Sequence, residues 1–272
     1  MNKEKYIEYA KKTFSGKTLD LVLKQIELFY KDDVVINKNK YSLGDDVYLK
    51  KGTFLHGLGN NNNNIDFVLN NGFIASEFNG DLKSKKYFNN IGVWNIKEDI
   101  YLKDYIKMYS GVTLTRNIDG VRDYKLVSHN EIIETIDELN NDKKVRIWNM
   151  QQTKEIKFLP SLSSNLVDYG FILNMESEYA KELANNDIFN PKMDKEILSY
   201  FVAEPFIDEL LNEPRNALTT DRESAIFFGL PNRLIEGVLV SKRIENDVNA
   251  LDILKSKLPE CYICNLDGKV IK

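Results

Sequence analysis

A chain of 272 residues that is 43% hydrophobic can bury one substantial core, with room for a helical appendage. The formal net charge of -4 and the pI near 5.5 exclude a broadly basic surface for nucleic acid or anionic membranes. No apolar run approaches the roughly 20 residues of a membrane span, and the first residues lack the apolar centre of a secretion signal. We therefore expect a globular, cytoplasmic protein with no membrane partner.

The N-terminal part, residues 1–45, is predicted to form a helical extension that packs against the main domain. Apolar residues recur at helical spacing over 6–14 and again over 19–29, and Gly16 is expected to end the first helix. From about Val47 onwards, short apolar runs alternate with Gly and Asn, which is typical of strands joined by short helices.

A strand ending in His-Gly, followed by a short helix closed by glycine, is the most informative segment of the chain. After the strand comes the asparagine tract 60–64, which we expect to be a mobile loop, and then a helix over 65–69 that ends at Asn71-Gly72-Phe73. His56, one of only two histidines, therefore lies beside the flexible backbone of Gly57, at the mouth of a predicted cleft. A purely structural histidine is the alternative interpretation.

Two aromatic residues follow in the next segment. Trp94 ends an apolar strand over 91–94, and Tyr105 stands eleven residues later in a helix-like stretch. A pair of aromatic side chains can bind a flat, electron-poor cationic ring by stacking. Ordinary core packing of both residues is the alternative interpretation.

The middle of the chain predicts further elements and no internal repeat. The predicted strands cover 121–128, 144–149 and 164–174, and the predicted helices cover 130–139, 176–186 and 194–212. Near the C-terminus, two strands over 235–240 and 262–264 flank a helix with an apolar face.

Two glutamates compete for the role of a catalytic carboxylate. Glu223 opens a predicted strand that reaches Pro231 eight residues later, whereas Glu236 lies inside the strand that follows this proline. A fixed carboxylate at such a position can stabilise the oxocarbenium-like sugar that forms when a glycosidic bond is cleaved. We prefer Glu223 and keep Glu236 as the alternative.

The two cysteines, Cys261 and Cys264, have the spacing of a metal or redox motif. Residues three apart on a strand point to opposite faces, and the sequence contains no second Cys pair nearby. We therefore expect two buried core residues and no metal site.

Together these segments resemble the NAD-binding elements of ADP-ribosyltransferases of the diphtheria-toxin and poly(ADP-ribose) polymerase type. His56-Gly57 and the helix ending in Asn71-Gly72-Phe73 resemble the first element of that family. There, the histidine holds the adenosine-side ribose and the following backbone grips the nicotinamide amide. Leu58 stands where the family has a hydroxyl residue, so this resemblance implies that one ribose or amide contact is missing.

The later elements resemble the same family. Residues 91–94 with Tyr105 resemble its pair of tyrosines, with Trp94 in the place of the first, and Glu223 opens a stretch that resembles the strand carrying the catalytic glutamate. The resemblance implies that Trp94 and Tyr105 flank nicotinamide and that Glu223 stabilises the ribosyl cation.

The resemblance implies an α+β protein with a split, two-sheet ADP-ribosyltransferase-like domain over 46–272, containing an insertion around 121–215. It also implies transfer of ADP-ribose from NAD to an unidentified protein or nucleic-acid acceptor, with release of nicotinamide. Two alternatives stay open, namely NAD hydrolysis with water as the acceptor, and a catalytically silent domain that binds NAD, ADP-ribose or a protein partner.

Overall fold

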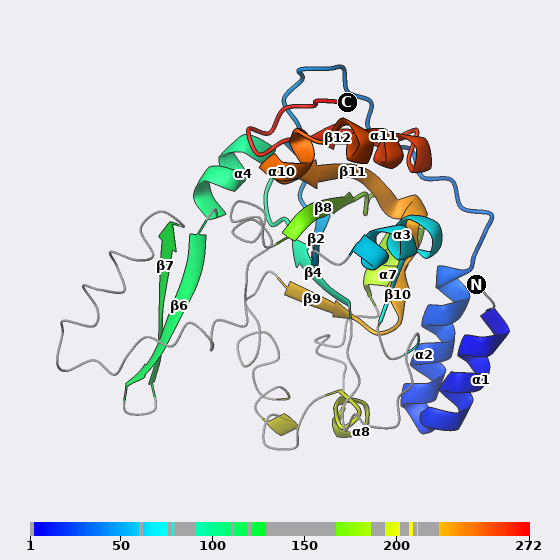
Figure 1. Ribbon diagram of the computed structural model, residues 1–272. Coiled ribbons are helices and arrows are strands. Elements are labelled where there is room, and N and C mark those ends of the chain that lie inside the picture. Colours follow the sequence, from blue (N-terminus) through cyan, green and yellow to red (C-terminus); the bar gives the residue numbers. More distant parts are fainter. Residues whose placement is uncertain are drawn as a thin grey trace.

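The chain belongs to the α+β class, with one mixed sheet of six strands and several helices (Figure 1). The computed structural model describes residues 3–59, 62–75, 78, 91–109, 111–118, 121–128, 167–185, 194–201, 207, 208, 211 and 223–272. Within these ranges only the backbone is described at residues 59, 62–64, 107–109, 111–118, 121–128, 167 and 223.

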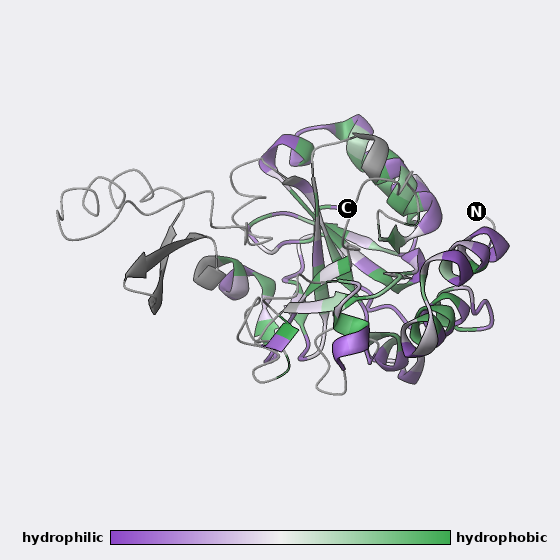
Figure 2. Ribbon diagram, turned by 90° about the horizontal axis from the view of Figure 1, so that it is seen from below, coloured by the Kyte–Doolittle hydropathy of each residue, from purple (hydrophilic) through white to green (hydrophobic). Residues whose placement is uncertain are grey.

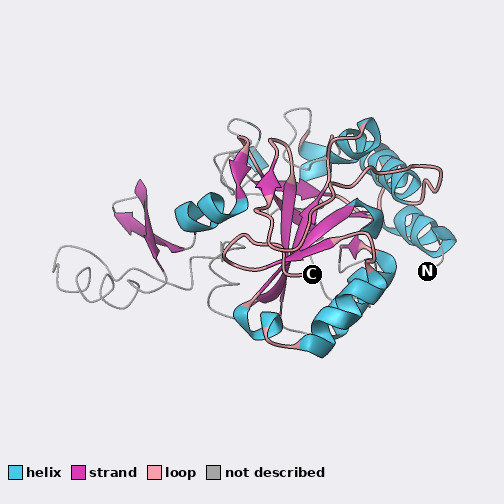
Figure 3. Ribbon diagram, turned by 90° about the horizontal axis from the view of Figure 1, so that it is seen from above, coloured by secondary structure: helices cyan, strands magenta, loops and turns pink. Residues whose placement is uncertain are grey.

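The six-stranded sheet is built from segments that are far apart in the sequence. In spatial order the strands are β12 (Tyr262–Cys264), β11 (Ile235–Val240), β8 (Val167–Leu173), β2 (Phe54–Gly59), β4 (Ile91–Asn95) and β9 (Glu223–Ile226). Neighbouring strands are antiparallel except β11 and β12, which are parallel. The helices α10 (Lys242–Glu245) and α11 (Val248–Lys257) make this parallel connection (Figure 3), as a crossover requires.

Three small sheets complete the strand pairing among the described residues. They pair β1 (Tyr48–Leu49) with β5 (Ile100–Tyr101), β3 (Phe73–Ile74) with β10 (Gly229–Leu230), and β6 (Gly111–Ile118) with β7 (Val121–Ser128). The 3-10 helix η4 (Asn232–Leu234) leads from β10 into β11.

The N-terminal residues form two helices, as predicted, and these helices are part of the core. The helices α1 (Lys3–Thr13) and α2 (Gly16–Phe29) turn their apolar faces inwards and leave polar residues outside (Figure 2). Most of their buried apolar residues share one hydrophobic cluster, which we call the Phe228 cluster, with side chains from the second half of the chain, including Ile197, Phe201, Phe227 and Phe228. Gly16 does not end the first helix but begins the second, with φ at +53°.

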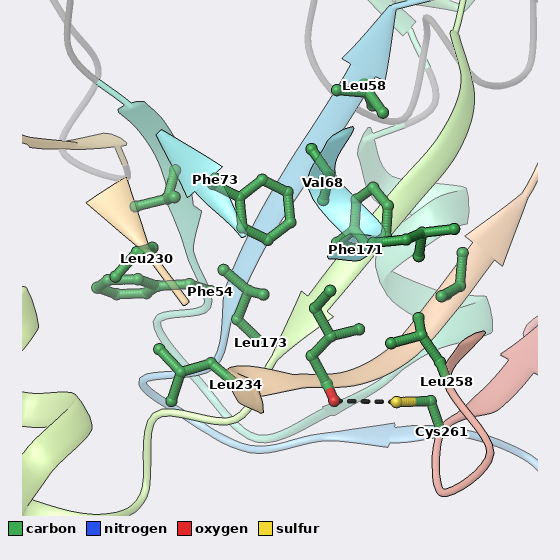
Figure 4. Packing of buried hydrophobic residues seen from close by; sticks show 14 of the residues in the cluster. Phe54, Leu58, Val68, Phe73, Phe171, Leu173, Leu230, Leu234, Leu258 and Cys261 are labelled. Atoms are coloured by element: carbon green, nitrogen blue, oxygen red, sulfur yellow. Dashed lines mark hydrogen bonds between the residues drawn. The ribbon is translucent and has the colours of Figure 1, made fainter. Parts of the chain in front are cut away.

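Each face of the six-stranded sheet carries its own hydrophobic cluster, because successive side chains on a strand alternate between the faces. The Phe171 cluster includes Phe54, Phe73 and Phe171, which Figure 4 labels, together with Val93 and Val238. The helices α3 (Asn62–Asn71), α7 (Glu178–Ala184) and α11 cover it. The Leu55 cluster occupies the other face and includes Leu55, Tyr105, Ile172, Leu239 and Tyr262.

Most of the predicted elements that fall on described residues are confirmed. The strands β7, β8, β11 and β12 and the helices α7 and α11 lie where the sequence predicts them. Besides the role of Gly16, two expectations are wrong: α3 begins within the asparagine tract, at Asn62, and the predicted helix over 194–212 is interrupted. α8 covers only Lys195–Leu198, residues 199–201 form a turn, and residues 207, 208 and 211 are helical again. Ser199 caps α8, with its hydroxyl donating to the Glu196 carbonyl at 2.7 Å.

The predicted elements over 130–139 and 144–149 lie outside the described residues. So does most of the predicted insertion around 121–215, and the domain boundary at residue 45 stays a prediction.

The two cysteines diverge across the sheet, as the strand prediction requires. Cys261 belongs to the Phe171 cluster and Cys264 to the Leu55 cluster. Both thiols are unbridged and buried, and they donate hydrogen bonds to the carbonyls of Ile235 and Val238 at 3.0 and 3.7 Å. Figure 4 shows the Cys261 contact. The side chains therefore act as small core residues.

Candidate functional site

The three strands that carry the predicted NAD-binding motifs are direct neighbours in the sheet. β4 lies between β2, which contains His56 and Gly57, and β9, which begins at Glu223. The helix α4 (Leu102–Tyr109) follows β4 closely in the sequence and carries Tyr105. Segments separated by more than half of the chain are thus brought to one half of the sheet (Figure 1).

His56 is tied to the neighbouring strand by its side chain. The ring nitrogen Nδ1 lies 2.8 Å from the Gly92 carbonyl oxygen, and the ring packs edge-on against Phe73 with centroids 4.9 Å apart. A carbonyl only accepts, so Nδ1 must carry the proton, and in the neutral ring Nε2 is left as an acceptor. Burial lowers the pKa of His56, although the bond to Gly92 opposes this effect. The imidazole is therefore neutral at physiological pH.

The ladder between β2 and β4 is short. Phe54 pairs with Asn95 and Leu55 pairs with Trp94, and the register stops there, although β2 continues to pair with β8 as far as Gly59. His56 is the first residue beyond the last pair, and its bond to Gly92 spans the two strands at this point. The sheet thus opens on the β4 side of the His-Gly sequence.

Three glycines and an alanine lie on neighbouring strands across the sheet next to this opening, and we call them the glycine strip. Gly57 pairs with Gly170 on β8, and Gly92 pairs with Ala225 on β9. By strand alternation, Gly57 faces the same side as Leu55, and Gly92 faces the same side as Trp94. Glycine within a strand often marks a place where a ligand or another backbone approaches closely.

Trp94 and Tyr105 lie together, but not on the His56 side of the sheet. Trp94 is half-buried and packs against the Leu55 cluster, of which Tyr105 is a buried member with 3% exposure. His56 instead meets Phe73 of the Phe171 cluster on the opposite face. The structure therefore places both aromatic residues at the Leu55 cluster and separates them from the imidazole.

The position of Glu223 is known for its backbone. It is the first residue of β9, as predicted, and it is the register partner of Trp94. Its backbone therefore lies one strand away from Trp94 and two residues before Ala225, at the border of the glycine strip.

Glu236, the alternative carboxylate, is buried elsewhere in a polar network. Its exposure is 5%, and its carboxylate oxygens accept from the amides of Asn39 at 2.9 Å and Asn174 at 2.5 Å. The register of β11 against β8 shifts between Ile235 and Gly237, so Glu236 is the extra residue of a β-bulge.

No sequence pattern marks the two asparagines as partners of Glu236. Asn39 lies in a loop without periodicity, and Asn174 directly follows an apolar strand.

Two kinds of feature are absent from the described part of the chain. No helix there is both long and apolar enough to pass through a membrane. Nor do three or more His, Cys, Asp or Glu side chains gather there in a way that would hold a metal ion.

No family model matches the chain, and neither a curated protein nor a solved structure matches it. Its function therefore has to be inferred from the residues and their geometry.

Proposed function

We propose that the protein binds NAD at the opening between β2 and β4 and transfers ADP-ribose to a macromolecular acceptor, releasing nicotinamide. The observation that carries the proposal is the adjacency of β2, β4 and β9, the strands whose sequences resemble the three NAD-binding elements. The finer assignment, an ADP-ribosyltransferase-like fold, is part of the same proposal.

The local chemistry supports a dinucleotide ligand. Gly57 and Gly92 are partly exposed and carry no side chain, so a flat ligand can approach their backbone, and the half-buried Trp94 beside them offers an aromatic face. His56 faces the opposite side of the sheet from Trp94, so in this proposal it supports the ligand indirectly, by holding the Gly92 carbonyl at the edge of the opening.

In the proposed reaction Glu223 acts on the charge that develops on the ribose. As the nicotinamide–ribose bond breaks, its electron pair leaves with nicotinamide and the ribose becomes oxocarbenium-like. A carboxylate stabilises this cation more than it stabilises NAD itself, so its effect is on turnover. Tyr105, being buried, contributes by supporting the cluster against which Trp94 packs.

The test is incubation of the protein with NAD labelled separately in nicotinamide and in the adenylate, with and without cell lysate. We expect nicotinamide release and transfer of the adenylate label to a macromolecule. Release without transfer would identify a NAD glycohydrolase, and binding without release would identify a silent NAD-binding domain. Absence of both NAD binding and release would overturn the proposal.

Single substitutions then test the separate roles of these residues. Glu223→Gln is expected to lower nicotinamide release by at least a hundredfold and to keep NAD binding, and His56→Ala is expected to weaken binding. Gly57→Val, which adds a side chain to the strip, is also expected to weaken binding. The control is Glu8→Gln, which removes an exposed carboxylate on α1. Equal loss of binding in the Glu223 and His56 variants would refute this division of roles.

A further inference from the structure

We draw no further inference here: the strongest candidate, the exposed aromatic pair of Tyr48 and Tyr101 on the small sheet of β1 and β5, carries nothing, because nothing among the described residues shows what would cover it.

Discussion

Replacing Gly72 by alanine tests the junction that closes α3 and leads the chain into β3. Gly72 has φ at +81°, and its amide donates to the Val68 carbonyl at 2.8 Å. A Cβ at this position would lie 2.8 Å from the Leu230 carbonyl oxygen and 2.9 Å from the Asn232 nitrogen, both of which are backbone atoms. The variant therefore suffers from an unfavourable φ and from a collision that no side-chain rotation relieves.

The two costs can be separated with a matched control. Gly52 has φ at +91° with nothing within 4 Å of the added Cβ, so Gly52→Ala should cost only the left-handed conformation, about 1–2 kcal/mol. Gly72→Ala adds the backbone overlap and should cost at least about 3 kcal/mol, in the range of severe packing errors. Urea unfolding of both variants measures the difference. Equal destabilisation would show that the chain around Leu230 does not approach Gly72 as closely as described.

Three further predictions use the same unfolding measurement or thiol chemistry. Burial lowers the pKa of His56, so below about pH 6.5 the unfolded chain binds more protons than the folded chain does. The free energy of unfolding should therefore decrease as the pH is lowered from roughly 7 to 5.5. His56→Asn should remove that fall and His129→Asn should keep it; the reverse would be inconsistent with a buried neutral His56. Burial raises the pKa of Cys261 and Cys264, so an aromatic disulfide reagent should label neither thiol before urea is added. Rapid labelling of the native protein would contradict their burial. Tyr179→Phe should cost about 1–2 kcal/mol, because the hydroxyl donates to the Leu28 carbonyl at 2.7 Å and accepts from Arg233; a neutral effect would mean that this link does not hold the end of α2.

The local elements could be predicted because their signals are local. Alternation around His56 predicts that Phe54 and Leu58 lie on one face of β2 and Leu55 on the other. In the structure Phe54 and Leu58 belong to the Phe171 cluster and Leu55 to the cluster on the opposite face. Helical spacing likewise predicts α1 and α2. In each case the pattern reports which side of an element meets the core.

The relations between elements could not be predicted in this way. Trp94 faces the Leu55 cluster because it pairs with Leu55, and this register depends on how two distant strands meet. A shift by one residue would have turned Trp94 towards the His56 side. The polar network of Glu236 depends on a β-bulge and on Asn39, neither of which leaves a periodic trace in the sequence.

The spatial order of the strands has a consequence for how the chain folds. β2 ends at Gly59, but β8, with which it forms its longer pairing, begins only at Val167. β4 is nearer to β2 in the chain, but the two strands pair over only two residues each. During synthesis, β2 therefore stays without its main partner until the segment between β2 and β8 has been synthesised and the two strands have paired across it. We expect slow refolding and a transient apolar strand edge that favours aggregation, so synthesis at reduced temperature should raise the folded yield.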